Sequence, residues 1–208
     1  FIGVPLSILA IGLLAGGRWL WASLGLIVVG AIAAIPWLNS PRVQAIFSGS
    51  GGTSFFRLAL WKSTLEMIRD HPWFGVGPDN FLYAYRGHYM LPEAWQESSL
   101  SHPHNVVLDF AARLGLMGLG VFIWLQIAFW VTAFRVMRQA KRALARDQWA
   151  LIIGLMASMI DFLTHGLVDA SYFVVDLAFV FMLTLALVQQ ADAVSETTSA
   201  GSGNLRYN

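Results

Sequence analysis

The chain contains no cysteine among its 208 residues, and charged residues make up only 12% of it. Without cysteine, neither a disulfide nor a thiolate-bound metal is available, and redox chemistry gives no clue to the compartment. Soluble domains carry about a quarter of their residues as charges, so this chain is poorly suited to a fully aqueous surface. Its formal net charge of +1 gives no reason to expect nucleic acid as a partner.

Hydrophobic residues dominate instead, at 57% of the chain with a mean hydropathy of +0.60. Because about 17 to 25 apolar residues cross a bilayer as a helix, we predict an all-α, polytopic membrane protein with about five transmembrane helices. The first run starts at Phe1 without an initiator methionine or a basic flank, so we expect the C-terminal part of a longer protein. The apolar runs lie at about 1–16, 19–38, 116–137, 149–168 and 172–189.

Basic residues between the third and fourth runs predict the orientation. The segment 135–148 contains Arg135, Arg138, Lys141, Arg142 and Arg146 but a single acid, Asp147. By the positive-inside rule this loop is cytoplasmic, which makes the long loop extracytoplasmic. The domains expected on this basis are two transmembrane helices over 1–38, an extracytoplasmic loop over 39–115, three transmembrane helices over 116–190, and a disordered cytoplasmic tail over 191–208.

The long loop has helical patterning of its own. After a flexible stretch over 48–52, Thr53 or Ser54 can cap a helix that Pro72 stops. We expect that helix to lie on the membrane or on the spans, because apolar residues repeat along it at helical spacing. They are Leu58, Trp61, Leu65 and Ile68.

A second loop helix is predicted from Pro103 or His104 to Leu114, ending at Gly115. Within it, Asp109 and Arg113 are spaced for an ion pair between successive turns.

The residues His102-Pro103-His104-Asn105 give the clearest signal for chemistry. Histidine titrates near neutral pH, so a pair at a membrane boundary indicates proton transfer or ligand binding. The alternatives without a role in chemistry are that His104 is solvated, that His102 only shapes the turn, and that Asn105 caps the helix rather than orienting an imidazole. Two histidines without a third ligand make an incomplete zinc site, so we predict no metal.

Four sequence motifs follow one another along the chain: FRLALW with Arg57 and Trp61, DHPWFGVGPDNF from Asp70, HPHNVVLDFAARLGLMG from His102, and HGLVD from His165 to Asp169. Taken in this order, they resemble the O-antigen ligase and polymerase superfamily, often called Wzy-C type. The resemblance covers about residues 55–187 and implies transfer or polymerisation of glycans carried on undecaprenyl diphosphate, at the outer side of the bacterial cytoplasmic (inner) membrane. It also implies the C-terminal part of a GT-C-like helical bundle.

By this resemblance His104 matches the catalytic base, and Arg57 matches a diphosphate-binding arginine. The expected partners are a polyprenyl-diphosphate-linked glycan, a glycan, lipid or protein acceptor, and membrane lipid. Because the N-terminal half of the family fold is not recognisable, we expect the isolated chain to be inactive. The other candidate substrate-binding residues are Trp61, His102, Asn105, His165 and Asp169.

Elementary chemistry is compatible with this role. A diphosphate leaves as a weakly basic anion, so transfer needs a base and a cation but no cofactor or metal. The alternative function is a transporter of a small solute or ion, because Asp161 and Asp176 fall deep in the predicted spans. A transporter keeps its polar residues near the bilayer midplane, whereas the histidine and arginine motifs lie in the long loop. The sequence therefore favours an enzyme.

Overall fold

A computed structural model describes residues 3–37, 40, 53–142, 145–169 and 172–204. Every regular element in these ranges is a helix, which confirms the predicted all-α class. The chain divides into two compact units. The bundle unit comprises residues 1–24, 124–164 and 172–208, and the loop unit comprises residues 25–123 and 165–171.

Within the described ranges, four helical segments are long and apolar enough to cross a membrane. They coincide with four of the five predicted runs and make the chain a multi-pass membrane protein. The first run forms α1 (Gly3–Ala15), whose 13 residues extend about 20 Å, short of the roughly 30 Å hydrocarbon core. The four longer segments are Arg18–Trp37, Val106–Arg142, Arg146–Gly166 and Val175–Thr197.

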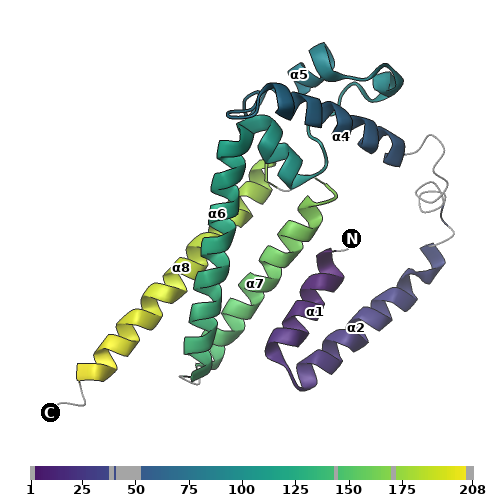
Figure 1. Cartoon of the computed structure of the whole chain (residues 1–208). Coiled ribbons are helices and arrows are strands. Elements are labelled where there is room, and N and C mark those ends of the chain that lie inside the picture. The colour runs from purple at the N-terminus through teal and green to yellow at the C-terminus, as the bar shows by residue number, and fades with distance from the viewer. Residues whose placement is uncertain (1–2, 38–39, 41–52, 143–144, 170–171, 205–208) are drawn as a thin grey trace. The chain divides into compact units, whose positions relative to one another are not determined.

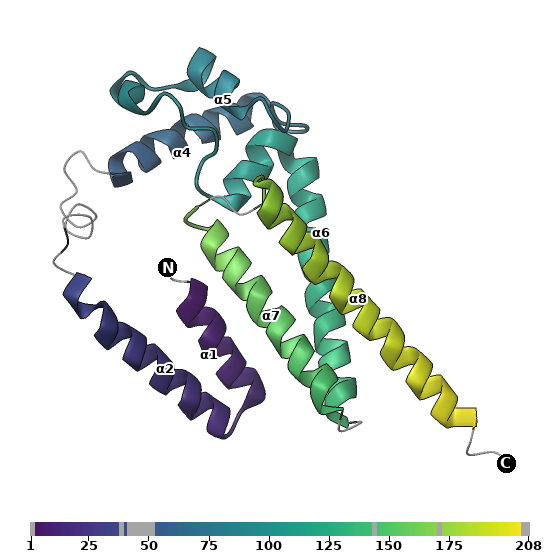
Figure 2. The ribbon, with the colours of Figure 1, turned by 180° about the vertical axis from the view of Figure 1, so that it is seen from behind.

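In the bundle unit, α7 (Arg146–Gly166) and α8 (Val175–Asn204) lie beside the later part of α6 (Val106–Arg142), as Figures 1 and 2 show. Buried aliphatic and methionine side chains fill the space between the helices, among them Val136, Ile152, Met156 and Val188. Two further helices precede them in the chain, α1 and α2 (Arg18–Ala34), and α2 runs into the short 3₁₀ helix η1 (Ile35–Trp37).

Two expectations about the ends of these helices need correction. The basic segment 135–148 is not a loop, because α6 continues to Arg142 and α7 begins at Arg146. The expected disordered tail is helical up to Asn204; Ala191, Ala193 and Glu196 favour helix there, and no proline stops it. Residues 205–208 lie outside the described residues.

In the loop unit, α4 (Thr53–Asp70) has bounds that agree with the predicted helix. The flexible stretch predicted over 48–52 and the side chains of the two candidate caps lie outside the described residues. Three short helices follow, α5 (Phe81–Ala84), the π-helix η2 (Tyr85–Tyr89) and the 3₁₀ helix η3 (Pro92–Glu97). Figure 1 shows α4 beside α5 and the start of α6.

The packed side of α4 differs from the predicted apolar stripe. Leu58 and Leu65 are each 55% exposed, so they form no part of the core. The reason is that α4 packs on η2 and η3, which turns a neighbouring face inward. The buried core of the unit consists of Leu60, Met67, Phe81, Tyr85, Tyr89 and Ala112. Whether the exposed stripe meets lipid stays a prediction.

A kink at Gly115 divides α6, as the sequence predicted for the end of the second loop helix. Gly115 has φ 67° and ψ −169°, a conformation that only glycine adopts easily. The kink leaves backbone groups of α6 without partners in the helix, and the loop over 72–77 satisfies them. Its four hydrogen bonds are Val76 N to Ala112 O, Gly77 N to Arg113 O, Leu116 N to Pro72 O and Met117 N to Trp73 O.

Candidate functional site

The turn over His102 to Asn105 precedes α6, which begins at Val106 rather than at residue 103 or 104 as predicted. Asn105 explains the difference, because its side-chain Oδ1 accepts hydrogen bonds from the backbone N–H groups of Val107 (3.0 Å) and Leu108 (3.1 Å). These are the second and third helical positions, where an N-cap side chain acts. Of the two roles considered for Asn105, capping is therefore the one observed.

His104 lies in the left-handed region of backbone space, with φ 52°. Histidine tolerates this conformation better than most side chains, but the conformation still costs free energy. It directs the imidazole to Asp169, and Nδ1 lies 2.8 Å from Asp169 Oδ1. Because a carboxylate only accepts, the neutral ring donates from Nδ1–H and keeps the lone pair of Nε2 free.

The end of α7 brings Asp169 to this position. The N–H groups of Val168 and Asp169 both donate to the carbonyl oxygen of His165, at 3.0 Å each, which closes a tight turn. Asn105 Nδ2 donates to the carbonyl of Leu167 at 3.1 Å. The helix cap thus also ties this turn to the start of α6. His165 contributes its backbone here, and its side chain is exposed.

His102 lies against His104, with ring centroids 4.2 Å apart. Its Nε2 is 3.7 Å from the same Asp169 oxygen, and its Nδ1 is 3.3 Å from Ser101 Oγ. Burial lowers the pKa of His102 below its usual 6.5, and the neighbouring His104 lowers it further, although Asp169 opposes both. His102 is therefore held neutral beside the His104–Asp169 pair.

The same three side chains offer a set of metal donors. One atom from each of His102, His104 and Asp169 lies within 4.8 Å of the other two. The prediction of no metal rested on the lack of a third ligand, and Asp169 corrects that premise. A zinc ion needs ligand nitrogens and oxygens at about 2.0 to 2.2 Å, so the direct 2.8 Å contact between His104 and Asp169 would have to open.

α4 also contacts the histidine turn, through the side chain of Trp61. The Trp61 indole Nε1–H donates to the carbonyl of Pro103 at 2.8 Å, and Pro103 is fully buried. Arg57 lies one turn earlier on the same side of α4. Its Nε is buried and has no hydrogen-bond partner within the described part of the chain, which leaves a guanidinium able to take an acceptor.

A buried ion pair anchors the rest of the turn, as the spacing of Asp109 and Arg113 predicted. Arg113 Nε donates to Asp109 Oδ1 at 2.6 Å, and both residues are buried. The other arms of the guanidinium donate to the carbonyls of Pro78 and Ser101, the residue before His102. The sequence suggested the pair, but not that Arg113 joins three segments beneath the histidines.

The site therefore brings together His102, His104, Asn105 and Asp169, with Trp61 supporting them through Pro103. Among the described residues, no hydrogen bond, ion pair or ring contact joins Arg57 or the His165 side chain to the imidazoles. The pairing of His104 with Asp169 spans 65 positions. The sequence signal for it was that each residue belongs to one of the motifs of the family resemblance.

Comparison with known proteins matches residues 1–123 to a family described as O-antigen ligase (Wzy_C). A similar protein is an O-antigen ligase of Pseudomonas aeruginosa, 29% identical over 109 residues. That stretch is 51% of this chain but 24% of the relative, so the chain spans about a quarter of the relative's length. Since the family match covers more than half of the residues, the chain belongs to the O-antigen ligase (Wzy_C) family.

Proposed function

We propose that the protein containing this chain transfers a glycan from undecaprenyl diphosphate to an acceptor hydroxyl, with His104 as the general base. The observation that carries the proposal is the 2.8 Å contact between His104 Nδ1 and Asp169 Oδ1, in a chain of the O-antigen ligase family. It leaves Nε2 as a free proton acceptor. The reaction takes place on the outer side of the cytoplasmic membrane, as the positive-inside rule predicts.

In the proposed step, the acceptor hydroxyl gives its proton to His104 Nε2 as its oxygen bonds to the anomeric carbon of the glycan. The bond from that carbon to the diphosphate oxygen breaks, and its electron pair leaves with the diphosphate. Asp169 stabilises the imidazolium that forms. General base catalysis of this kind contributes typically 10² to 10⁴-fold.

His102 supports the base by staying uncharged. Its ring lies 4.2 Å from that of His104, so a proton on His102 would repel the proton that His104 has to accept. Burial and the presence of His104 keep its pKa low, which removes this competition near neutral pH. An uncharged His102 therefore does not compete with His104 for the Asp169 carboxylate.

Arg57 is the proposed partner of the diphosphate. Its buried Nε lacks a hydrogen bond to any described residue, and such a donor is costly unless a ligand satisfies it. A guanidinium can hold a phosphate through two parallel hydrogen bonds while negative charge develops on the leaving group. Trp61, one turn away, supports this arrangement by fixing the histidine turn through Pro103.

The position of the ionisable cluster favours an enzyme over a transporter. His102 and His104 precede α6, and Asp169 follows the end of α7. Transporters place such groups at broken helices near the bilayer midplane, whereas these side chains lie in turns outside the helices. The acceptor therefore has to reach the turn that contains the histidines, and no path through the helical bundle is required.

The test is to incubate the purified full-length protein with an undecaprenyl-diphosphate glycan and separate lipid, glycan and protein acceptors, with and without a chelator. We expect stoichiometric release of undecaprenyl diphosphate with one acceptor class, at the same rate in both conditions. Failure of every acceptor would contradict glycosyl transfer. A rate that the chelator abolishes and zinc restores would instead assign His102, His104 and Asp169 to a metal.

A further inference from the structure

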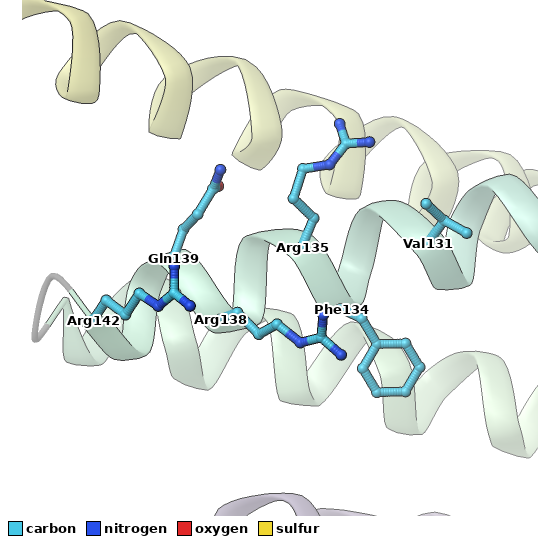
Figure 3. A pocket seen from close by; sticks show the side chains of 6 residues that line it. All are labelled: Val131, Phe134, Arg135, Arg138, Gln139 and Arg142. Carbon is cyan, nitrogen blue, oxygen red and sulfur yellow. The ribbon is translucent and has the colours of Figure 1, made fainter.

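The bundle unit contains a cavity at the C-terminal end of α6, far along the chain from the histidine turn. Its volume is about 620 Å³. Figure 3 shows the side chains that line it, all of them from α6. They are Val131, Phe134, Arg135, Arg138, Gln139 and Arg142.

Two of the three arginines are available to a ligand. Arg135 Nη1 lies 3.2 Å from Asp192 Oδ2 of α8, and Gln139 Oε1 accepts a hydrogen bond from Ser195 Oγ at 2.7 Å. In Figure 3 these two side chains point toward α8. Arg138 and Arg142 lie away from α8 and are exposed, and no ion pair or hydrogen bond engages them within the described ranges.

The order of side chains along α6 matches the cross-section of a lipid layer. Val131 and Phe134 are 54% and 39% exposed and belong to the apolar run. The arginines follow on the same face, spread over about 10 Å of the helix axis at 1.5 Å per residue. An apolar surface followed by guanidinium groups fits acyl chains followed by a phosphate.

We propose that this cavity binds the headgroup of an anionic phospholipid. Arg138 and Arg142 would hold the phosphate, because guanidinium groups match phosphate oxygens through paired hydrogen bonds, while Val131 and Phe134 contact the acyl chains. Basic residues clustered at the end of a transmembrane helix attract anionic headgroups. The apolar half of the cavity favours a lipid over a soluble phosphate. This inference does not depend on the proposed glycosyl transfer.

The test is native mass spectrometry of the detergent-purified protein during titration with phosphatidylglycerol and, separately, phosphatidylcholine. Removing one basic group near an anionic lipid costs roughly fivefold in affinity. We therefore expect the double variant Arg138→Gln, Arg142→Gln to lose about 25-fold in apparent affinity for phosphatidylglycerol. Binding of phosphatidylcholine should stay weak in both proteins.

A matched control removes two charges from the same end of the bundle. Lys141 and Arg146 line a separate cavity of about 250 Å³. The variant Lys141→Gln, Arg146→Gln should keep its affinity for phosphatidylglycerol within about threefold, because diffuse attraction alone is weak at physiological salt. Equal losses in the two variants would overturn the proposal and show non-specific attraction. No loss in the first variant would overturn it as well.

The unaltered protein provides a second measurement that does not depend on variant folding. Inorganic phosphate and glycerol phosphate, added at physiological ionic strength, should not displace phosphatidylglycerol when each replaces an equal ionic strength of chloride. Displacement by either would identify a soluble phosphate as the ligand and contradict the lipid assignment.

Discussion

Replacing Asp169 by asparagine removes a negative charge at His104 while keeping an oxygen that can accept the Nδ1 hydrogen. At the observed 2.8 Å, the attraction between a carboxylate and an imidazolium is about 1.5 kcal/mol in water and about 6 kcal/mol at an effective dielectric constant near 20. The Asp169 side chain is 45% exposed and that of His104 20%, so the true value belongs toward the lower limit.

A loss of about 1.5 to 3 kcal/mol in the transition state corresponds to a fall in kcat of roughly 10- to 100-fold. Partners that orient a functional histidine have effects of similar size. The assay is release of undecaprenyl diphosphate at saturating donor and acceptor. KM should change little, because Asp169 acts on the imidazole and not on the bound glycan.

The control is the same substitution in a protein that already carries His104→Ala. If Asp169 acts through His104, the second substitution should lower the remaining rate no further. A further tenfold fall in that background would refute the reasoning, because it would show that the carboxylate contacts substrate directly. A fall in kcat of less than twofold in Asp169→Asn alone would also refute the reasoning, because the carboxylate would then contribute little to the rate.

Three other predictions concern the kink, the second histidine and the arginine of α4. Gly115→Ala should lower the free energy of unfolding by about 2 kcal/mol or more, because residue 115 has a positive φ and the added Cβ would meet the backbone of residues 73 and 74. In the control Gly120→Ala the added Cβ meets no neighbour, so the melting temperature should stay unchanged or rise. Burial lowers the pKa of His102 below 6.5, so just below that pH the unfolded chain binds more protons than the folded chain. Stability should therefore fall as pH drops below 6.5. The variant His102→Gln should remove that part of the dependence of the melting temperature on pH. Arg57→Lys should slow donor turnover at least tenfold by losing paired phosphate contacts, whereas Arg69→Lys, exposed on the same helix, should not; equal rates would contradict diphosphate binding by Arg57.

Local features of the fold were predictable where the sequence contains its own stop and pairing signals. Pro72 follows α4 by two residues, and Gly115 interrupts α6 at the predicted place. The Asp109–Arg113 pair follows from helical spacing alone. Each of these outcomes depends on residues within one or two turns of each other, for which backbone sterics and capping are decisive.

Long-range features were not predictable in the same way. The contact between His104 and Asp169 depends on how the end of α7 approaches the start of α6, which no local pattern specifies. The no-metal prediction counted ligands along the sequence and so did not include Asp169 as a third donor; whether a metal binds stays a prediction. Apolar spacing on α4 predicted a face toward the membrane or the spans, which stays a prediction, and it did not indicate that η2 and η3 would pack on the face that contains Leu60 and Met67.

In the proposed step, His104 and not the adjacent His102 removes the proton from the acceptor. The most direct measurement compares single-turnover glycan transfer by His104→Ala and His102→Ala in the full-length protein, with membrane insertion and donor binding measured in parallel. We predict a fall of at least 10²-fold for His104→Ala with donor binding retained, and a fall of less than tenfold for His102→Ala. Normal transfer by His104→Ala, or a larger loss in His102→Ala, would contradict the assignment of His104 as the general base.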